Sequence, residues 1–382
     1  MGFHEFSSSY DWSRIAAYKR TAKAAFGGMI DLSVGSPVDP VPDSVRKALA
    51  VAANDPNAYG YPATAGTADL RAAIAEWFSA TRNVDLQAIH ADVVPTVGSK
   101  EGVALMASLL HFGEDDVVVQ PKVSYPTYEI GTQLAGAQVL KVDDVADVAS
   151  WRNVPGVKAV WVNSPCNPTG EVYSAERMAG IVAAAREIGA VVLSDECYAL
   201  MQWRGATNSA DDDPLQSTPC ALRSDVCAGS AEGVLVLYSL SKQSNMAGYR
   251  TAFIAGDESL IASMSAYRKQ IGQIIPGPVQ AAMAAGLRDL ESVKVQHARY
   301  RERLGVLVSA LRAYGYCTDM PDGALYVWVR AKSGDCWTDM EQLAKIGIIA
   351  SPGEFYGAPE CLRFSATASD EAIASAAERL AR

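Results

Sequence analysis

Lys242 follows a strand-like apolar segment, residues 233–238, close to the point where that segment ends. Partial loss of hydration at such a position favours the neutral amine, which makes a lysine a nucleophile toward carbonyl groups. Hydroxyl and guanidinium groups, which suit phosphate oxygens, stand nearby at Ser239, Ser241 and Arg250. A lysine beside a phosphate site is what covalently held pyridoxal phosphate requires. The alternative, for this residue taken alone, is an ordinary solvated loop lysine.

Two other strand ends carry polar residues. Gly98, Ser99 and Lys100 join a strand expected over residues 92–97 to a helix, and the free N–H groups and positive dipole of a helix N-terminus attract anions. A simple helix cap is the alternative. Asp195 ends another strand, where a buried carboxylate needs a cationic partner such as a protonated pyridine nitrogen. A helix cap or an ion pair with an arginine is the alternative for Asp195.

Three more residues suit a ring-shaped cofactor and an amino-acid substrate. Asn167 lies in an Asn-Pro-Thr-Gly turn after a strand, and its amide could donate to a cofactor oxygen. Tyr125 could stack on a ring or pack in the core. Arg363 lies in a short apolar strand, so it needs an anion, either a substrate carboxylate or a structural salt bridge.

The elements that must position these residues alternate between strands and helices. This pattern predicts an α/β fold in which helices cover both faces of a mostly parallel, seven-stranded-type sheet. Ligands bind at the carboxyl ends of strands in such sheets, which is where the polar residues fall. Residues 316–382 indicate a smaller α+β unit, and the polar stretch 204–232 is expected to be a surface excursion. The strands are expected at residues 92–97, 116–120, 138–142, 157–162, 190–194, 233–238 and 251–256.

Composition excludes several function classes. The 382 residues carry 33 basic and 43 acidic side chains, a net charge of −10, which disfavours nucleic-acid binding. The seven cysteines form no Cys-x-x-Cys pair and the four histidines are far apart, so neither a disulfide framework nor a metal site is predicted. No run approaches eighteen apolar residues and no signal-peptide pattern opens the chain. We expect a soluble, cytoplasmic protein without membrane partners.

In their order and spacing, these residues resemble the fold-type I pyridoxal-phosphate enzymes, specifically the class I and II aminotransferases. The resemblance covers the chain from about Leu32 to its C-terminus. It implies a pyridoxal 5'-phosphate cofactor held by Lys242, which would also move the proton at the substrate Cα. It further implies that Asp195 keeps the pyridine nitrogen protonated, and that Tyr198 and Asn167 hydrogen-bond the phenolic oxygen. The matching residues are Gly98, Ser99, Lys100, Tyr125, Asn167, Asp195, Tyr198, Ser239, Lys242, Arg250 and Arg363.

The resemblance also assigns the remaining contacts. Tyr125 would stack on the cofactor ring, Arg363 would bind the substrate α-carboxylate, and Gly35 and Asn167 would contact the substrate. The phosphate would be bound by residues that include Gly98, Ser99, Lys100, Ser239, Ser241 and Arg250.

Quaternary and domain structure are implied in the same way. Tyr61, with Tyr59 as the alternative, would reach the phosphate in the neighbouring subunit of a homodimer with composite active sites. The expected domains are an N-terminal arm with part of the small domain (1–40), a large cofactor-binding domain (41–275) and a small domain (276–382).

The segments 32–42 and 237–250 look like actinobacterial succinyldiaminopimelate transaminases of lysine biosynthesis. This resemblance implies ping-pong transfer involving N-succinyl-LL-2,6-diaminopimelate, glutamate and 2-oxoglutarate. A substrate with a distal carboxylate calls for a second cation beyond Arg363. The residues considered for it are Arg14, Lys19, Lys122 and Lys269.

Rival functions share part of this pattern. A carbon–sulfur β-lyase of the cystathionine type would use the same cofactor-binding residues on a different bond. A pyridoxal-phosphate-binding regulatory protein would need a basic DNA-binding domain before the matching region, and the net charge of −10 disfavours it. A dinucleotide-dependent dehydrogenase is disfavoured because no Gly-x-Gly-x-x-Gly follows a strand.

Overall fold

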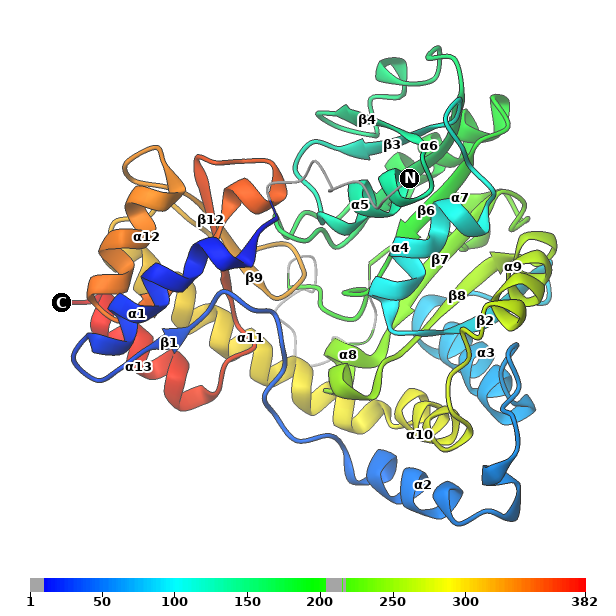
Figure 1. Ribbon diagram of the computed structural model, residues 1–382, viewed down its shortest axis with the longest axis horizontal. Coiled ribbons are helices and arrows are strands. Elements are labelled where there is room, and N and C mark those ends of the chain that lie inside the picture. Colours follow the sequence, from blue (N-terminus) through cyan, green and yellow to red (C-terminus); the bar gives the residue numbers. More distant parts are fainter. Residues whose placement is uncertain (1–9, 204–214, 216–217) are drawn as a thin grey trace, which may run out of the picture.

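The computed structural model in Figure 1 describes residues 10–203, 215 and 218–382. Its centre is a seven-stranded sheet in the order β2-β8-β7-β6-β5-β3-β4. All neighbouring strands run parallel except around β8, which is antiparallel to both β7 and β2. The prediction of a mostly parallel α/β sheet is therefore confirmed. The strands are β2 (Ala91–Val97), β3 (Val117–Pro121), β4 (Gln138–Val142), β5 (Val157–Asn163), β6 (Val191–Asp195), β7 (Val234–Ser239) and β8 (Thr251–Asp257).

Alternate residues of each central strand pack on opposite faces of this sheet. Every residue of β7 is buried. Val234, Val236 and Tyr238 join one hydrophobic core, whereas Leu235 and Leu237 join another. Strands that are apolar on both sides must be covered by helices on both sides.

Helices cover the two faces accordingly. One face packs against α4 (Ser99–Leu109), α5 (Thr127–Leu134) and α9 (Glu258–Gln270). The other face packs against α2 (Asp43–Ala53), α3 (Ala68–Arg82), α6 (Ala175–Glu187), α7 (Ser224–Cys227) and α10 (Gly277–Arg288).

A second core combines the two ends of the described chain (Figure 1). In it β1 (Ile30–Asp31) pairs in parallel with β10 (Ile348–Ile349). A three-stranded antiparallel sheet has the order β11-β12-β9. The other elements of this part are α1 (Ala16–Ala24), α11 (Leu290–Ala313), β9 (Tyr326–Arg330), α12 (Cys336–Lys345), β11 (Ser351–Pro352), β12 (Cys361–Ser365) and α13 (Asp370–Leu380).

The domain boundaries expected at residues 40 and 275 stay a prediction, and α10, which follows the second boundary, packs in the core of the large sheet. Within the described residues, no helix combines the length and the apolar character that crossing a membrane would need.

The excursion expected over residues 204–232 lies partly outside the described residues. Of its described part, 218–232, several residues are buried in the large core, among them Cys220, Leu222 and Val226. The prediction of a surface excursion is therefore wrong for this part. Its apolar side chains lie within an otherwise polar stretch, so average polarity concealed them.

A buried ion pair holds this segment against the large core. Arg82 ends α3, and its Nη2 lies 2.8 Å from Glu196 Oε2, with the two side chains only 0% and 1% exposed. Glu196 also accepts hydrogen bonds from the Ser194 hydroxyl at 3.0 Å and from the Ala221 N–H at 2.8 Å. Arg82 donates to the Pro219 carbonyl at 3.1 Å. The pair thus joins α3, the end of β6 and the 218–221 segment.

We expect Arg82→Met to lower the free energy of unfolding by about 3–5 kcal/mol, because Glu196 would remain buried without its cation. Urea unfolding followed by tryptophan fluorescence measures the change. The control is Arg46→Met, which removes the exposed Arg46–Asp43 pair and should cost less than about 1 kcal/mol. Equal losses in the two variants would contradict the proposed importance of the buried pair.

Candidate active site

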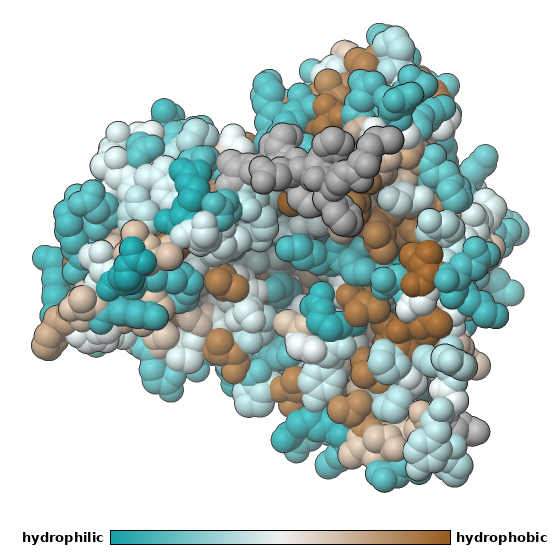
Figure 2. Space-filling model, viewed as in Figure 1, coloured by the Kyte–Doolittle hydropathy of each residue, from teal (hydrophilic) through white to brown (hydrophobic). Residues whose placement is uncertain are grey.

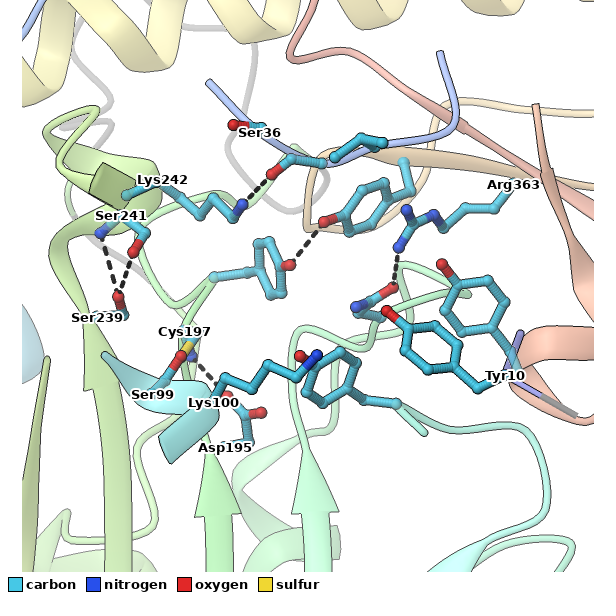
Figure 3. Close-up of a pocket in the computed structure, with 18 of the residues that line it drawn as sticks. Tyr10, Ser36, Ser99, Lys100, Asp195, Cys197, Ser239, Ser241, Lys242 and Arg363 are labelled. Atoms are coloured by element: carbon cyan, nitrogen blue, oxygen red, sulfur yellow. Dashed lines mark hydrogen bonds between the residues drawn. The ribbon is translucent and has the colours of Figure 1, made fainter. Parts of the chain in front are cut away.

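A cavity of about 370 Å³ lies at the carboxyl ends of β6 and β7, between the large sheet and the second core. Twelve residues predicted from the sequence line it, while Gly98 lies directly beside it and Tyr61 is fully exposed outside it. Figure 3 shows Lys242, Asp195 and Arg363 directed toward this cavity from different elements. The twelve are Gly35, Ser99, Lys100, Tyr125, Asn167, Asp195, Tyr198, Ser239, Ser241, Lys242, Arg250 and Arg363.

Sheet register explains why the predicted phosphate ligands meet. Val97, the last residue of β2, pairs with Thr251 of β8, and Ser239, the last residue of β7, pairs with Ala252. The residues just beyond these positions, Gly98 and Arg250, must therefore lie at the same edge of the sheet.

The end of the cavity where a phosphate is predicted to bind is rich in donors. The N-terminus of α4 begins at Ser99, and a Cβ at Gly98 would clash with the Arg250 guanidinium. The Ser239 hydroxyl donates to Ser241 Oγ at 2.8 Å. A helix N-terminus, a guanidinium and two hydroxyls fit a phosphate dianion.

Lys242 lies on α8 (Leu240–Gln243), a short helix that directly follows β7. Its Nζ donates to the Gly35 carbonyl. Burial lowers the pKa of the Lys242 ammonium below its usual value. The amine is therefore easier to deprotonate than a solvated lysine and suits nucleophilic attack on a carbonyl carbon.

Asp195 is buried at the end of β6. Its Oδ2 accepts a hydrogen bond from the Tyr128 hydroxyl at 2.8 Å and its Oδ1 accepts one from the Cys197 N–H at 3.2 Å. Within the described ranges no lysine, arginine or histidine forms a salt bridge with it, and burial raises the pKa of the Asp195 carboxyl. A cationic ring nitrogen would supply the missing charge.

Arg363 lies on β12 and is buried at the opposite side of the cavity. Its Nη1 donates to Asn167 Oδ1 at 2.8 Å and its Nη2 donates to the Ser33 carbonyl at 2.8 Å. Its Nε is buried and has no hydrogen-bond partner within the described part of the chain. The guanidinium lies 4.0 Å from the ring centroid of Tyr326 and 4.8 Å from that of Tyr356. A buried guanidinium with neutral neighbours fits a carboxylate ligand.

Together these groups fit pyridoxal phosphate. A donor-rich anion site, a lysine and an uncompensated buried carboxylate line one cavity, as the phosphate, carbonyl carbon and pyridine nitrogen of that cofactor require.

Several cavity residues were missed by the sequence reasoning. Tyr128 does not line the cavity but donates a hydrogen bond to Asp195, and it was missed although it stands only three positions after Tyr125. Cys197 lines the cavity and stands between Asp195 and Tyr198 in the sequence, but it was given no role. Other lining residues come from segments that no motif marked, because only the folded chain brings them to the cavity. These are Tyr10, Trp12, Tyr326 and Tyr356.

Comparison with known proteins agrees with this geometry. The family described as aminotransferase class I and II matches residues 27–380. The chain is 40% identical over 373 residues to the 4-dedimethylamino-4-oxo-anhydrotetracycline transaminase of Streptomyces rimosus, covering 97% of this chain and 98% of that protein. It is also 40% identical over 377 residues to a probable aminotransferase of Mycobacterium tuberculosis, covering 97% and 84%.

Among solved structures, a probable N-succinyldiaminopimelate aminotransferase of Thermus thermophilus superposes with a TM-score of 0.84 at 27% identity. The superposition covers 97% of this chain and 99% of that one.

We expect Gly98→Ala to raise the dissociation constant of pyridoxal phosphate by about tenfold. The φ and ψ angles of Gly98 are +78° and 158°, a backbone region essentially restricted to glycine that costs other residues about 1–3 kcal/mol, and the new Cβ would displace Arg250. Titrating the apoenzyme with pyridoxal phosphate measures the constant. The control is Gly180→Ala, because a Cβ at Gly180 on α6 would lie in open space. Equal affinities for pyridoxal phosphate in the two variants would contradict a role for the close contact between Gly98 and Arg250.

Proposed function

Because the chain belongs to the class I and II aminotransferase family, we propose that it transfers amino groups between N-succinyl-LL-2,6-diaminopimelate, glutamate and their 2-oxo acids by a ping-pong mechanism. Members of this family depend on pyridoxal phosphate and act on amino acids and 2-oxo acids. The observation that carries the proposal is the convergence of Lys242, Asp195 and Arg363 on one cavity. The place we propose for the enzyme is cytoplasmic lysine biosynthesis.

The cavity residues divide the chemistry among them. Bound pyridoxal phosphate supplies an electron sink for the negative charge that develops at the substrate Cα. Lys242 would hold the cofactor through its Nζ, and the same amine would serve as the base for the proton at the substrate Cα. Asp195 keeps a proton on the ring nitrogen through its negative charge. Tyr198 donates a hydrogen bond to the phenolic oxygen, and Tyr125 covers the ring.

Arg363 binds the α-carboxylate in this scheme. Its two terminal nitrogens currently donate to Asn167 Oδ1 and the Ser33 carbonyl. Both acceptors are neutral, so an incoming carboxylate is the stronger partner for the guanidinium. Release of the Asn167 side chain would leave its amide to contact the cofactor and the substrate, and Gly35 lies on the same side as Ser33.

Lys100 is the cation best placed for a distal carboxylate. The described cavity has four cationic side chains, and the other three, Lys242, Arg250 and Arg363, already have roles. The Lys100 Nζ lies 5.4 Å from the Tyr10 ring centroid, and Figure 3 shows the side chain extending into the cavity toward Tyr10. The four cations considered from the sequence, none of which lines the cavity, are Arg14, Lys19, Lys122 and Lys269.

A second candidate substrate is a ketone on a fused-ring skeleton. The name of the Streptomyces rimosus relative describes such a substrate for that protein. Here Tyr10 and Trp12 line the cavity with ring centroids 5.9 Å apart, and Phe355 packs against both. Aromatic walls favour flat, apolar substrate groups.

We further propose a homodimer in which the partner subunit's Tyr61 contacts the phosphate. In the single chain Tyr61 is 102% exposed and Tyr59 is 86% exposed. Val51 is also 74% exposed. Figure 2 shows hydrophobic residues gathered over the large-sheet part of the face in view. Large exposed side chains of this kind favour burial at a protein interface.

A panel of amino donors and keto acceptors tests the function. We expect the holoenzyme to form glutamate from 2-oxoglutarate when N-succinyl-LL-2,6-diaminopimelate is the donor. Lys242→Ala should lose both this activity and the visible absorption band of bound cofactor, because no amine remains to hold it. Pyruvate release from cystathionine without glutamate formation would instead establish the β-lyase, and amination of a fused-ring ketone alone would favour the second candidate.

Lys100→Met should raise the KM for 2-oxoglutarate by about tenfold, the loss expected for one charge-assisted hydrogen bond. The KM for pyruvate, which lacks a second carboxylate, should change little. Steady-state kinetics with both acceptors give the comparison, and Lys122→Met, an exposed residue paired with Asp143, is the control. Equal increases in the KM for 2-oxoglutarate and for pyruvate would indicate that Lys100 binds the cofactor phosphate and not the distal carboxylate.

A further inference from the structure

Tyr326 connects three parts of the cavity. It begins β9, and its hydroxyl lies 2.7 Å from the Tyr198 hydroxyl. Its ring centroid lies 4.0 Å from the Arg363 guanidinium. A Cβ at Gly35 would clash with the Tyr326 hydroxyl, so the backbone there lies directly against it. The Gly35 carbonyl in turn accepts the hydrogen bond from Lys242.

Counting protons fixes the direction of the bond between the two phenols. Each tyrosine has a single O–H. If Tyr198 donates its proton to the phenolic oxygen of the cofactor, Tyr198 cannot also donate to Tyr326. Tyr326 must therefore be the donor and the Tyr198 oxygen the acceptor. A phenol that accepts a hydrogen bond becomes a better donor itself, because hydrogen bonds in a chain polarise one another.

We propose that Tyr326 is a positioning residue that couples the carboxylate site to the cofactor site: its ring covers Arg363 and its hydroxyl directs the Tyr198 proton into the cavity. This inference rests on the proposed function, since it takes the roles of Tyr198 and Arg363 from there. The guanidinium over the ring favours proton donation by the Tyr326 hydroxyl, because a cation stabilises the negative charge drawn onto its oxygen.

The coupling gives the carboxylate a second effect beyond binding. When a carboxylate neutralises Arg363, its positive field on Tyr326 weakens. Tyr326 then donates less strongly to Tyr198, and Tyr198 donates less strongly to the cofactor oxygen. Within the described residues, the titratable and charged groups that interact electrostatically with Tyr326 include Tyr125, Tyr198, Lys242, Tyr300, Tyr356 and Arg363.

The test is an absorbance titration of the holoenzyme against pH. The absorption band of bound cofactor changes when the nitrogen that joins it to Lys242 loses its proton. The negative phenolic oxygen stabilises that proton. A hydrogen-bond donor to this oxygen reduces its negative charge, and so lowers the pH at which the band changes. Tyr326→Phe keeps the ring over Arg363 but removes the donor. We expect its midpoint to lie about half to one pH unit above that of the wild type.

The matched control is Tyr316→Phe. Tyr316 is buried in the same core, and its hydroxyl donates to Asp339 Oδ2 at 2.8 Å, away from the cavity. This variant should keep the wild-type midpoint. Thermal melting of both variants checks that a shifted midpoint does not arise from general loosening of the core.

A second arm adds saturating glutarate, which offers a carboxylate to Arg363 and cannot react. It should raise the wild-type midpoint, and it should raise the Tyr326→Phe midpoint by less than half as much. Tyr326→Leu, which also removes the ring, should bind glutarate more weakly than Tyr326→Phe does.

The outcomes separate the two proposals. A Tyr326→Phe midpoint within about 0.2 unit of the wild type, together with an unchanged glutarate response, would overturn the role of Tyr326 while leaving the transaminase intact. If the wild type showed no absorption band of bound cofactor, or if the band persisted in Lys242→Ala, the proposed function itself would be wrong.

Discussion

The cost of burying negative charge governs the centre of this molecule. Two acidic residues, Asp195 and Glu196, stand side by side where β6 ends, and both are buried. Glu196 is matched by Arg82. Among the described residues, the hydrogen-bond donors to Asp195 are neutral groups, which include the Tyr128 hydroxyl and the Cys197 N–H. The chain thus neutralises one of two adjacent carboxylates with its own cation and leaves the other for a ligand that brings a positive charge of its own.

On the other side of the cavity a buried positive charge likewise lacks an ionised partner. Arg363 is buried among phenol rings, an amide oxygen and a carbonyl, and none of these partners is ionised. At both positions the described partners are uncharged, so Arg363 suits a carboxylate ligand and Asp195 suits a cationic one. A ligand that binds these two residues would therefore also stabilise the folded protein, because it would supply the missing opposite charges.

Much of this arrangement could be predicted because it depends on local sequence. Strands such as β2 and β7 are apolar runs that end in small polar residues, and parallel strands bring those ends together. Contacts that depend on the pairing of distant segments could not be predicted. Tyr326 meets Tyr198 across 128 positions in the sequence, and Arg82 meets Glu196 across 114. The buried part of the 204–232 stretch was missed because the acidic run at residues 211–213 makes the stretch polar on average, although its second half is rich in apolar residues.

The pairing of β1 with β10 has a consequence for how the protein is made. Ile30 leaves the ribosome long before Ile348, its partner in that two-stranded sheet. At ordinary elongation rates the delay is on the order of tens of seconds. The large sheet, whose strands all lie between residues 91 and 257, can close during this interval. Residues 30 and 31 therefore have no strand partner until translation is nearly complete, so this small sheet must form after the large one can already have closed.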